Sequence, residues 1–339
     1  MKKNISVLSL LFCVTIGFSQ NHHIARKINV PGDDGWDYLA VDNINQHLFI
    51  SHGNVVNVVD LKTDKTIATI PDTKGVHGIA IANDLNKAFI TDGKDNAVTI
   101  VNLTTFALIE KLTIEGQRPD AVLYDQFSHK VFTYNAKTTD ATVIDATTNK
   151  VVKTIPLGGK PEFSVTNGKG LIYVNIEDKN EIKTIDATKL EVVNTWSIVP
   201  GDEPSGLAMD VENNRLFAVC GNNIMVIVDA TNGKVMTTLP IGEGCDGVAF
   251  DADKKLAFSS NGLGSITVVK EENPTTFSVI ETIPTQKGAR TIAVNKVNHE
   301  LYLPTAEFGV KPEPTAENPK PRPGLKPNSF EILVVAPSK

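Results

Sequence analysis

Seven side chains that could carry chemistry recur about forty residues apart, each at the start of a short apolar segment related to a Gly-x-Ala pattern. They are Asp37, His77, Asp120, Glu162, Ser205, Asp246 and Arg290. Carboxylates suit Ca²⁺, Mg²⁺ or Mn²⁺, and imidazole suits Zn²⁺ or Cu²⁺. An arginine fork can instead clamp a carboxylate or a phosphate. If the fold brings the seven segments together, these side chains predict a binding site.

Three roles are assigned to these and nearby residues. His77 and Glu162 are the candidate proton-transfer groups if the protein is an enzyme. The candidate metal ligands are His52, His77, Asp92 and Glu162. The candidate ligand-binding residues are Asp37, His77, Asp120, Glu162, Asp246, Arg290 and Glu307. No consecutive motif such as His-Glu-x-x-His is present, so simple ion pairing of the carboxylates with Arg290 stays open as the alternative.

A repeat of about forty residues positions these side chains. Its clearest copies begin Gly-Ile-Ala-Ile at 78–81, Gly-Leu-Ala-Met-Asp at 206–210 and Gly-Val-Ala-Phe-Asp at 247–251. In each copy an Asx residue follows the apolar segment, where its side chain can cap a tight turn. Two or three further short apolar segments then follow before the next copy. Strands at this spacing predict four-stranded blades.

Seven such copies predict an all-β, seven-bladed β-propeller in which the blades surround a central channel. The seventh copy ends after its third strand, and a strand-like segment at 24–31 has no blade of its own. We therefore expect this N-terminal strand to complete the last blade and to close the ring. Such closure removes a sheet edge that could otherwise pair with another chain.

The blades resemble YVTN repeats, in Tyr173-Val174-Asn175 and in Phe89-Ile90-Thr91-Asp92, with Val-Asp or Ile-Asp at 59–60, 144–145 and 185–186. The chain is thus similar to YncE-like seven-bladed propellers over nearly its whole length. The resemblance implies the fold. It leaves the function open, because such propellers include binding proteins, lactonase-like hydrolases and surface proteins.

The N-terminus has the pattern of a secretory signal peptide. Lys2 and Lys3 precede an apolar run that ends near small residues at Gly17 and Ser19, so residues 1–19 are expected to be removed before Gln20. The remaining 20–339 form one domain, which we expect to be a periplasmic or secreted monomer without membrane insertion. With 33 basic and 39 acidic residues the formal charge is 33 − 39 = −6, which argues against nucleic acid as a partner.

Two further features are functionally ambiguous. Cys220 and Cys245 could form a disulfide, remain thiols, or join His52 or His77 in a copper site. A proline-rich loop at about 305–328 interrupts the last blade, with Glu307 at its root, and we expect it on the same face as the charged ring.

Three functions are compatible with these features. The preferred one is binding of a small molecule, a metal ion or a peptide at the mouth of the channel. No cofactor is required by the sequence, although a divalent metal ion would fit the residue types. The second is a metal-dependent hydrolase or lactonase that uses the same carboxylates and His77. The third is a surface scaffold for protein partners, without chemistry in a pocket.

Overall fold

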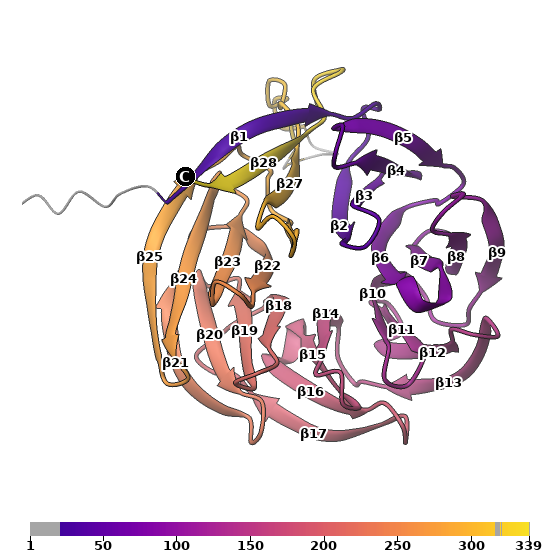
Figure 1. Ribbon diagram of the computed structural model, residues 1–339, viewed down its shortest axis with the longest axis vertical. Helices are drawn as coiled ribbons and strands as arrows, with labels where there is room; N and C mark the ends of the chain where they lie inside the picture. The colour runs from indigo at the N-terminus through magenta and orange to yellow at the C-terminus, as the bar shows by residue number, and fades with distance from the viewer. Residues whose placement is uncertain (1–20, 316–318, 320, 339) are drawn as a thin grey trace, which may run out of the picture.

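The computed structural model describes residues 21–315, 319 and 321–338. The predicted signal peptide lies outside these residues. The described chain forms seven four-stranded antiparallel sheets, arranged in a ring around a central axis (Figure 1). The prediction of a seven-bladed β-propeller is therefore confirmed. Among the described residues, no helix has the length and hydropathy needed to cross a membrane.

Each blade runs from an inner strand at the axis to an outer strand at the rim. The inner strands are β2 (Trp36–Asp42), β6 (Val76–Ala82), β10 (Pro119–Asp125), β14 (Pro161–Thr166), β18 (Pro204–Asp210), β22 (Cys245–Asp251) and β26 (Ala293–Val294). The second strands are β3 (His47–His52), β7 (Lys87–Asp92), β11 (Lys130–Asn135), β15 (Leu171–Ile176), β19 (Arg215–Cys220), β23 (Leu256–Asn261) and β27 (Leu301–Thr305).

The third strands are β4 (Val55–Asp60), β8 (Ala97–Asn102), β12 (Asp140–Asp145), β16 (Glu181–Asp186), β20 (Ile224–Asp229), β24 (Ser265–Asn273) and β28 (Glu331–Pro337). The outer strands are β5 (Lys65–Ile70), β9 (Leu108–Thr113), β13 (Lys150–Pro156), β17 (Glu191–Ser197), β21 (Lys234–Pro240), β25 (Thr276–Pro284) and β1 (His22–Asn29). Two short 3₁₀ turns, η1 (Asn83–Leu85) and η2 (Glu177–Lys179), complete the described elements.

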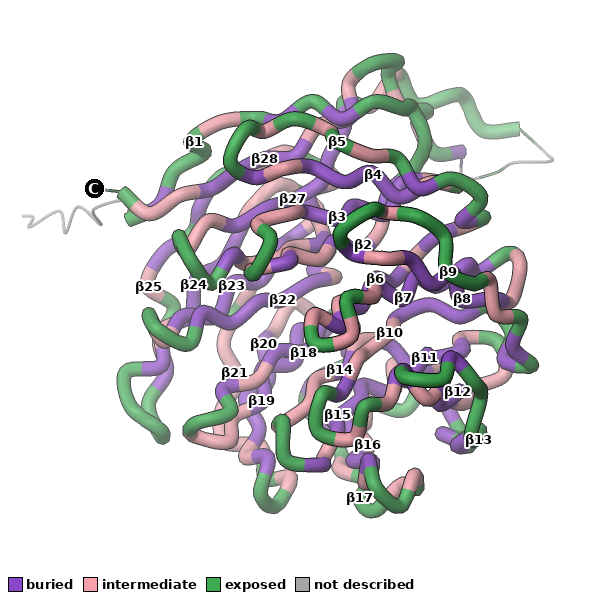
Figure 2. Tube along the Cα trace, turned by 45° about the vertical axis from the view of Figure 1, so that its right-hand side comes forward, coloured by how far each residue is buried: buried purple, intermediate pink, exposed green. Residues whose placement is uncertain are grey.

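The core consists of apolar layers between neighbouring blades, shown by the buried inner part of the tube in Figure 2. In each blade the second strand contributes an almost fully buried aromatic ring at the same place in the repeat. These rings belong to Phe49, Phe89, Phe132, Tyr173, Phe217, Phe258 and Tyr302. In β6 and β22 the register places Ala80 opposite Phe89 and Ala249 opposite Phe258. The alanine of the repeated pattern thus leaves room for a large ring beside it.

The Asx residues of the repeat cap turns, as predicted. Asp42 Oδ1 accepts the backbone N–H groups of Ile44 and Asn45, at 3.0 and 3.1 Å. Asp251 Oδ1 accepts those of Asp253 and Lys254 in the same way. These bonds satisfy backbone donors that the turn removes from the ladder. Because this turn recurs in the blades and favours an Asx residue at its start, the repeat of about forty residues is visible in the sequence.

Closure by the N-terminus is also confirmed. β1 pairs with β28 along its length, from His22 opposite Pro337 to Asn29 opposite Glu331. The strand begins and ends two residues before the predicted 24–31 segment. Ile28 is buried in the layer between the last blade and the first.

A buried pair of carboxyl groups links the fifth and sixth blades. Asp210 and Glu271 are almost fully buried, and Asn213 Nδ2 donates to Asp210 Oδ2 at 2.8 Å and to Glu271 Oε1 at 2.9 Å. Burial, followed by the contact with Asp210, raises the pKa of Glu271 to about 7. Native Glu271 therefore keeps a proton that the unfolded chain releases near its ordinary pKa.

We predict that Glu271→Gln stabilises the protein above pH 7 by about 1–2 kcal/mol. The native state of the parent protein binds the extra proton between about pH 4.5 and the folded pKa of about 7, so its stability falls as the pH rises through that window. Glutamine replaces the protonated acid and has no such penalty. Urea unfolding at pH 5 and pH 8 checks this, and an equal effect at both values would contradict it.

Candidate functional site

Bulges in the inner strands turn the predicted side chains toward the channel. In β2 the register with β3 shifts between Trp36 and Leu39, a pair that brackets Asp37. In β6 the same shift brackets His77, between Val76 and Ile79. The equivalent shifts in β10, β14, β18 and β22 bracket Asp120, Glu162, Ser205 and Asp246. A bulge re-aims the side chain at its extra residue, so the repeat presents one of these groups per blade.

Hydrogen bonds between blades hold these bulges in place. Thr91 Oγ1 donates to the Asp120 carbonyl of the next blade at 2.5 Å. Thr291 Oγ1 donates to the Asp37 carbonyl at 2.7 Å, across the junction where the ring closes. Asn175 Nδ2 donates to the Ser205 carbonyl at 2.9 Å. Each bond satisfies a carbonyl that the bulge removes from the ladder, and so fixes the backbone beneath the site.

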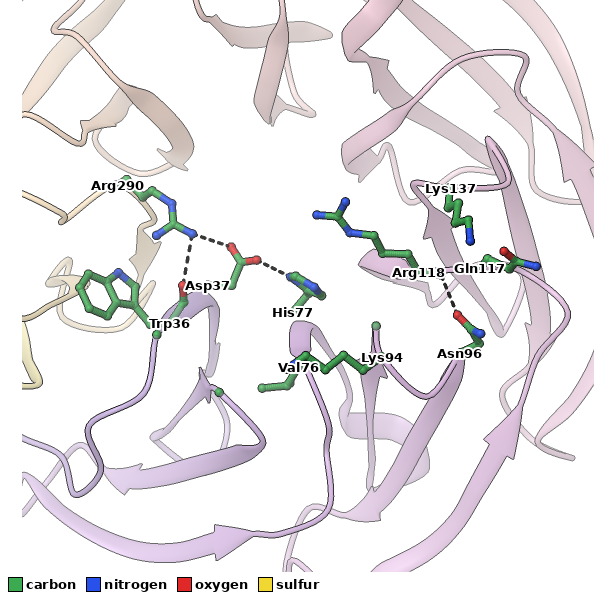
Figure 3. A pocket seen from close by; sticks show the side chains of 14 residues that line it. Trp36, Asp37, Val76, His77, Lys94, Asn96, Gln117, Arg118, Lys137 and Arg290 are labelled. Carbon is green, nitrogen blue, oxygen red and sulfur yellow. Dashed lines mark hydrogen bonds and ion pairs between the residues drawn. The ribbon is translucent and has the colours of Figure 1, made fainter. Parts of the chain in front are cut away.

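Five of the predicted side chains form one ion-pair chain. Its middle part, from Arg290 through Asp37 to His77, is drawn in Figure 3. His77 Nδ1 donates to Asp37 Oδ2 at 2.6 Å and lies 3.7 Å from Asp120 Oδ1. Arg290 Nη2 lies 3.5 Å from Asp37 Oδ1, and Arg290 Nε donates to Asp246 Oδ2 at 2.8 Å. These ion pairs therefore form a series along the wall of the channel in which acidic and basic groups alternate.

Burial and neighbouring charges set the protonation of this chain. Burial opposes the charge on His77, but the hydrogen bond to Asp37 and the charge of Asp120 outweigh it and raise the pKa of His77. Burial raises the pKa of Asp120, and it raises that of Asp246 to about 6 although Arg290 opposes the shift. Burial thus favours the neutral forms of Asp120 and Asp246, whereas the hydrogen bond to Asp37 and the charge of Asp120 favour the protonated form of His77.

Glu162 occupies a separate part of the ring. Its Oε1 lies 2.7 Å from Lys160 Nζ, and Lys160 also pairs with Glu177. Burial and then the charge of Asp120 raise the pKa of Glu162 to about 8, against the influence of Lys160. Glu162 does not line the cavity described next. The two candidate proton-transfer residues, His77 and Glu162, thus have different partners.

A cavity of about 600 Å³ opens above the ion-pair chain. On one side it is lined by Trp36, Asp37, His77 and Arg290, and on the other by Asn96, Gln117, Arg118 and Lys137, with Lys94 beside Val76 between them (Figure 3). Deeper in the ring, Tyr38 of β2 and Phe163 of β14 meet with ring centroids 5.3 Å apart. These strands lie on different sides of the axis in Figure 1, so the two rings narrow the channel beneath the cavity.

The sequence did not predict Lys94, Arg118 and Lys137 as site residues. They lie on loops beside the chosen positions, and their types are common on any exposed loop. One signal was available for Arg118. Two positions before the predicted channel residue stands Gly75 in the second blade and Gly244 in the sixth, both with positive φ. In the third blade this position is Arg118, at φ 55°.

The structure groups possible metal ligands differently from the prediction. Asp37, His77 and Asp120 each offer an atom within 4.8 Å of the others. Neither His52 nor Asp92 nor Glu162 belongs to any group of three or more such residues in the described chain. His52 uses both ring nitrogens, on Asn57 Oδ1 at 3.1 Å and on the Asp34 carbonyl at 3.0 Å.

Asp92 and a second acidic group also have structural partners. Asp92 is fully buried, accepts a hydrogen bond from Thr99 Oγ1 at 2.6 Å, and has its pKa raised to about 7 by burial. Asp251, Asp253 and His299 form another group of ligand atoms, at the far end of β22. There His299 Nδ1 lies 2.7 Å from Asp251 Oδ2, next to the turn that Asp251 caps.

Cys220 and Cys245 are close together, and both carry free thiols in the structure. Cys245 Sγ donates to the Cys220 carbonyl at 3.0 Å. Burial raises the pKa of each thiol to about 12, so neither is a thiolate near neutral pH. Neither joins His52 or His77 in a group of possible ligands among the described residues.

The root of the proline-rich loop packs beside the cavity without lining it. The Phe308 ring lies 6.3 Å from Trp36, and Phe308 bridges to Leu325. Glu307 pairs with Lys326 at 2.7 Å and is largely exposed. It is not among the residues that line the cavity. In Figure 1 the described part of this loop projects past the edge of the ring near β1, not over the axis.

Comparisons with known proteins support the β-propeller fold but do not assign the protein to a family. No protein-family model matches the chain, and no curated protein matches it. The chain is similar to a solved structure of RRP9 WD40 repeats, with a TM-score of 0.75 and 10% identity over 91% of this chain and 97% of that one. It is also similar to Kuenenia stuttgartiensis hydrazine synthase, with a TM-score of 0.69 and 15% identity over 80% and 93%. A structure of U3-55K gives a TM-score of 0.74 and 11% identity over 91% and 97%. Identities this low indicate a shared architecture, not a shared activity.

Proposed function

We propose that this protein is an exported, monomeric YncE-like propeller that binds a small molecule at the mouth of its channel. One observation carries the proposal: charged and polar groups of four blades line a single cavity of about 600 Å³. A volume of this size suits a small ligand. The bulges and the hydrogen bonds between blades hold its walls before any ligand arrives, which lowers the entropic cost of binding.

His77 is the best residue with which to test the site. Its Nδ1 is bonded to Asp37, while its Nε2 lies next to Gly93, which also lines the cavity. A Cβ added at Gly93 would lie 2.8 Å from His77 Cδ2 and 2.9 Å from Nε2. Gly93→Ala therefore displaces the ring without changing its chemistry, whereas His77→Ala removes it.

The experiment is a thermal-shift screen of the purified protein with a small-molecule library. A ligand present at 100 times its Kd stabilises the native state by about 2.7 kcal/mol. We expect at least one ligand to raise the Tm of the parent protein, and both His77→Ala and Gly93→Ala to reduce that shift. The absence of any shift across the library would favour the scaffold alternative and contradict the proposal.

The second candidate function is a metal-dependent hydrolase or lactonase. The grouping of Asp37, His77 and Asp120 favours it, because two carboxylates and an imidazole are suitable ligands for a divalent cation. Such a cation would act as a Lewis acid and would lower the pKa of a bound water. However, the 2.6 Å bond between His77 and Asp37 holds a proton where a cation would have to bind, so metal would compete with protonation.

Elemental analysis before and after chelation tests this second function. The hydrolase requires bound metal and turnover in a panel of lactones and esters, with lower rates in His77→Ala and Glu162→Gln. A metal-free protein whose folding is indifferent to a chelator would exclude it and leave the binding function standing.

A further inference from the structure

We propose that the ligand at the channel mouth is an anion with two or more carboxylate or phosphate groups, held by Lys94, Arg118 and Lys137. This inference rests on the binding function proposed above and names its ligand class. It is carried by Arg118 and Lys137, on the wall opposite Arg290, and by Lys94, which lies beside Val76 in the same cavity (Figure 3).

These three cations differ from the other basic residues of the ring in having no ion pair within 4.0 Å. Arg290 pairs with Asp246 and Asp37, and Lys160 pairs with Glu162 and Glu177. Among the described residues, the ion pairs near the channel mouth involve neither Lys94 nor Arg118 nor Lys137. Three basic side chains without an ion pair therefore share one cavity in a protein whose formal charge is −6.

Asp37 is the one acidic residue among those that line the cavity, and it is already paired. It is bonded to His77 and lies beside Arg290. An incoming anion would therefore meet the three cations without an unpaired carboxylate among the lining residues. The amide side chains of Asn96 and Gln117 line the same wall and add neutral hydrogen-bonding groups.

The backbone at Arg118 is a second, independent observation. Arg118 has φ 55°, in the left-handed region, at a position that glycine occupies in other blades as Gly75, Gly244 and Gly288. A side chain in that region costs about 1–2 kcal/mol. The same structural cap recurs beneath it: Asn96 Oδ1 accepts the Arg118 N–H at 2.9 Å, as Asn54 Oδ1 accepts the Gly75 N–H at 3.0 Å.

The loop that carries Arg118 is rigid. Ala136 N–H donates to the Arg118 carbonyl at 3.0 Å, and Lys137 N–H donates to the Gln117 carbonyl at 3.2 Å. The same bonds thus position both Arg118 and Lys137. In Figure 3 the Arg118 guanidinium extends toward the middle of the cavity. Its planar fork binds a carboxylate or a phosphate through two parallel hydrogen bonds, and the lysines add point charges.

The test measures binding of inorganic pyrophosphate and of citrate by isothermal titration calorimetry at low ionic strength. Glucose serves as a neutral probe of similar size. We expect at least one anion to bind, with an affinity that falls as salt is added, and glucose not to bind. The stronger of the two anions identifies phosphate or carboxylate as the preferred group.

Arg118→Gly provides a sharp variant because it removes the guanidinium while suiting the left-handed backbone. We expect its Tm to be unchanged or higher and its affinity for the anion to fall about tenfold, which corresponds to 1.4 kcal/mol. Glu203→Gly is the matched control. Glu203 occupies the equivalent position in the fifth blade at φ 50°, its N–H is capped by Asn180 Oδ1 at 2.9 Å, and it does not line the cavity.

The outcomes separate the two proposals. An affinity within twofold of the parent in Arg118→Gly would overturn the cationic site, and so would an equal loss in Glu203→Gly. If a neutral or cationic molecule from the library binds and neither anion does, the anion inference is wrong while the binding function stands. If no small molecule binds, the binding function itself fails.

Discussion

Deleting residues 22–29 is expected to prevent the formation of a stable monomer. The deletion removes β1 and leaves the edge of β28 without its ladder partner. Residues 332–335 of that edge are fully buried and apolar. An exposed apolar edge pairs readily with other chains, so we expect association as well as a fall in Tm of more than about 10 °C. Size-exclusion chromatography and thermal unfolding measure the two effects.

A matched pair of substitutions tests whether β1 stabilises the ring through its buried contacts, without removing any part of the chain. Ile28 and Ile24 are the same residue type on the same strand, but Ile28 is 2% exposed and Ile24 is 38% exposed. We expect Ile28→Ala to destabilise by about 2–4 kcal/mol and Ile24→Ala by less than about 1 kcal/mol. A deletion variant that remained monomeric with its Tm within a few degrees would show that β1 does not close the ring.

The sequence predicted the architecture well because its signals are local. An Asx residue caps a turn through its own neighbours, and an alanine opposite an aromatic ring recurs in five of the seven blades, as with Ala80 and Phe89. Such signals recur from blade to blade even where the blades share few other residues. The last inner strand shows the limit, because only Ala293–Val294 pairs there, whereas the inner strands of the other blades have six or seven residues.

The site could be predicted only in part, because its contacts join residues that are distant in the sequence. The repeat located the residues of the ring, and the structure brings Asp37, His77, Asp120, Asp246 and Arg290 into one chain of contacts. Sequence could not show that His52 points at Asn57 and the Asp34 carbonyl. Nor could it show that Lys94, Arg118 and Lys137 line one cavity, since this depends on how loops of two blades approach each other.

The alternating charges of the ring lead to the second large prediction. We expect Arg290→Met to destabilise the protein by about 2–3 kcal/mol at pH 8. The substitution removes the cation that lies 2.8 Å from Asp246 and 3.5 Å from Asp37, while both carboxylates keep their places in the channel. The loss stays below that of a fully buried pair because the Arg290 side chain is 36% exposed and solvent screens part of the charge.

The dependence on pH distinguishes charge from packing in this variant. Burial already raises the pKa of Asp246 to about 6 in the presence of Arg290, and removing the cation raises it further. Native Arg290→Met therefore binds more protons than its unfolded chain at intermediate pH, so its stability falls as the pH rises. We expect a clearly smaller loss at pH 5 than at pH 8, measured by urea unfolding.

The double variant Asp246→Asn/Arg290→Met should recover part of the loss at pH 8, because it removes the uncompensated charge. An equal loss at both pH values, with no recovery in the double variant, would mean that Arg290 stabilises the ring only by packing.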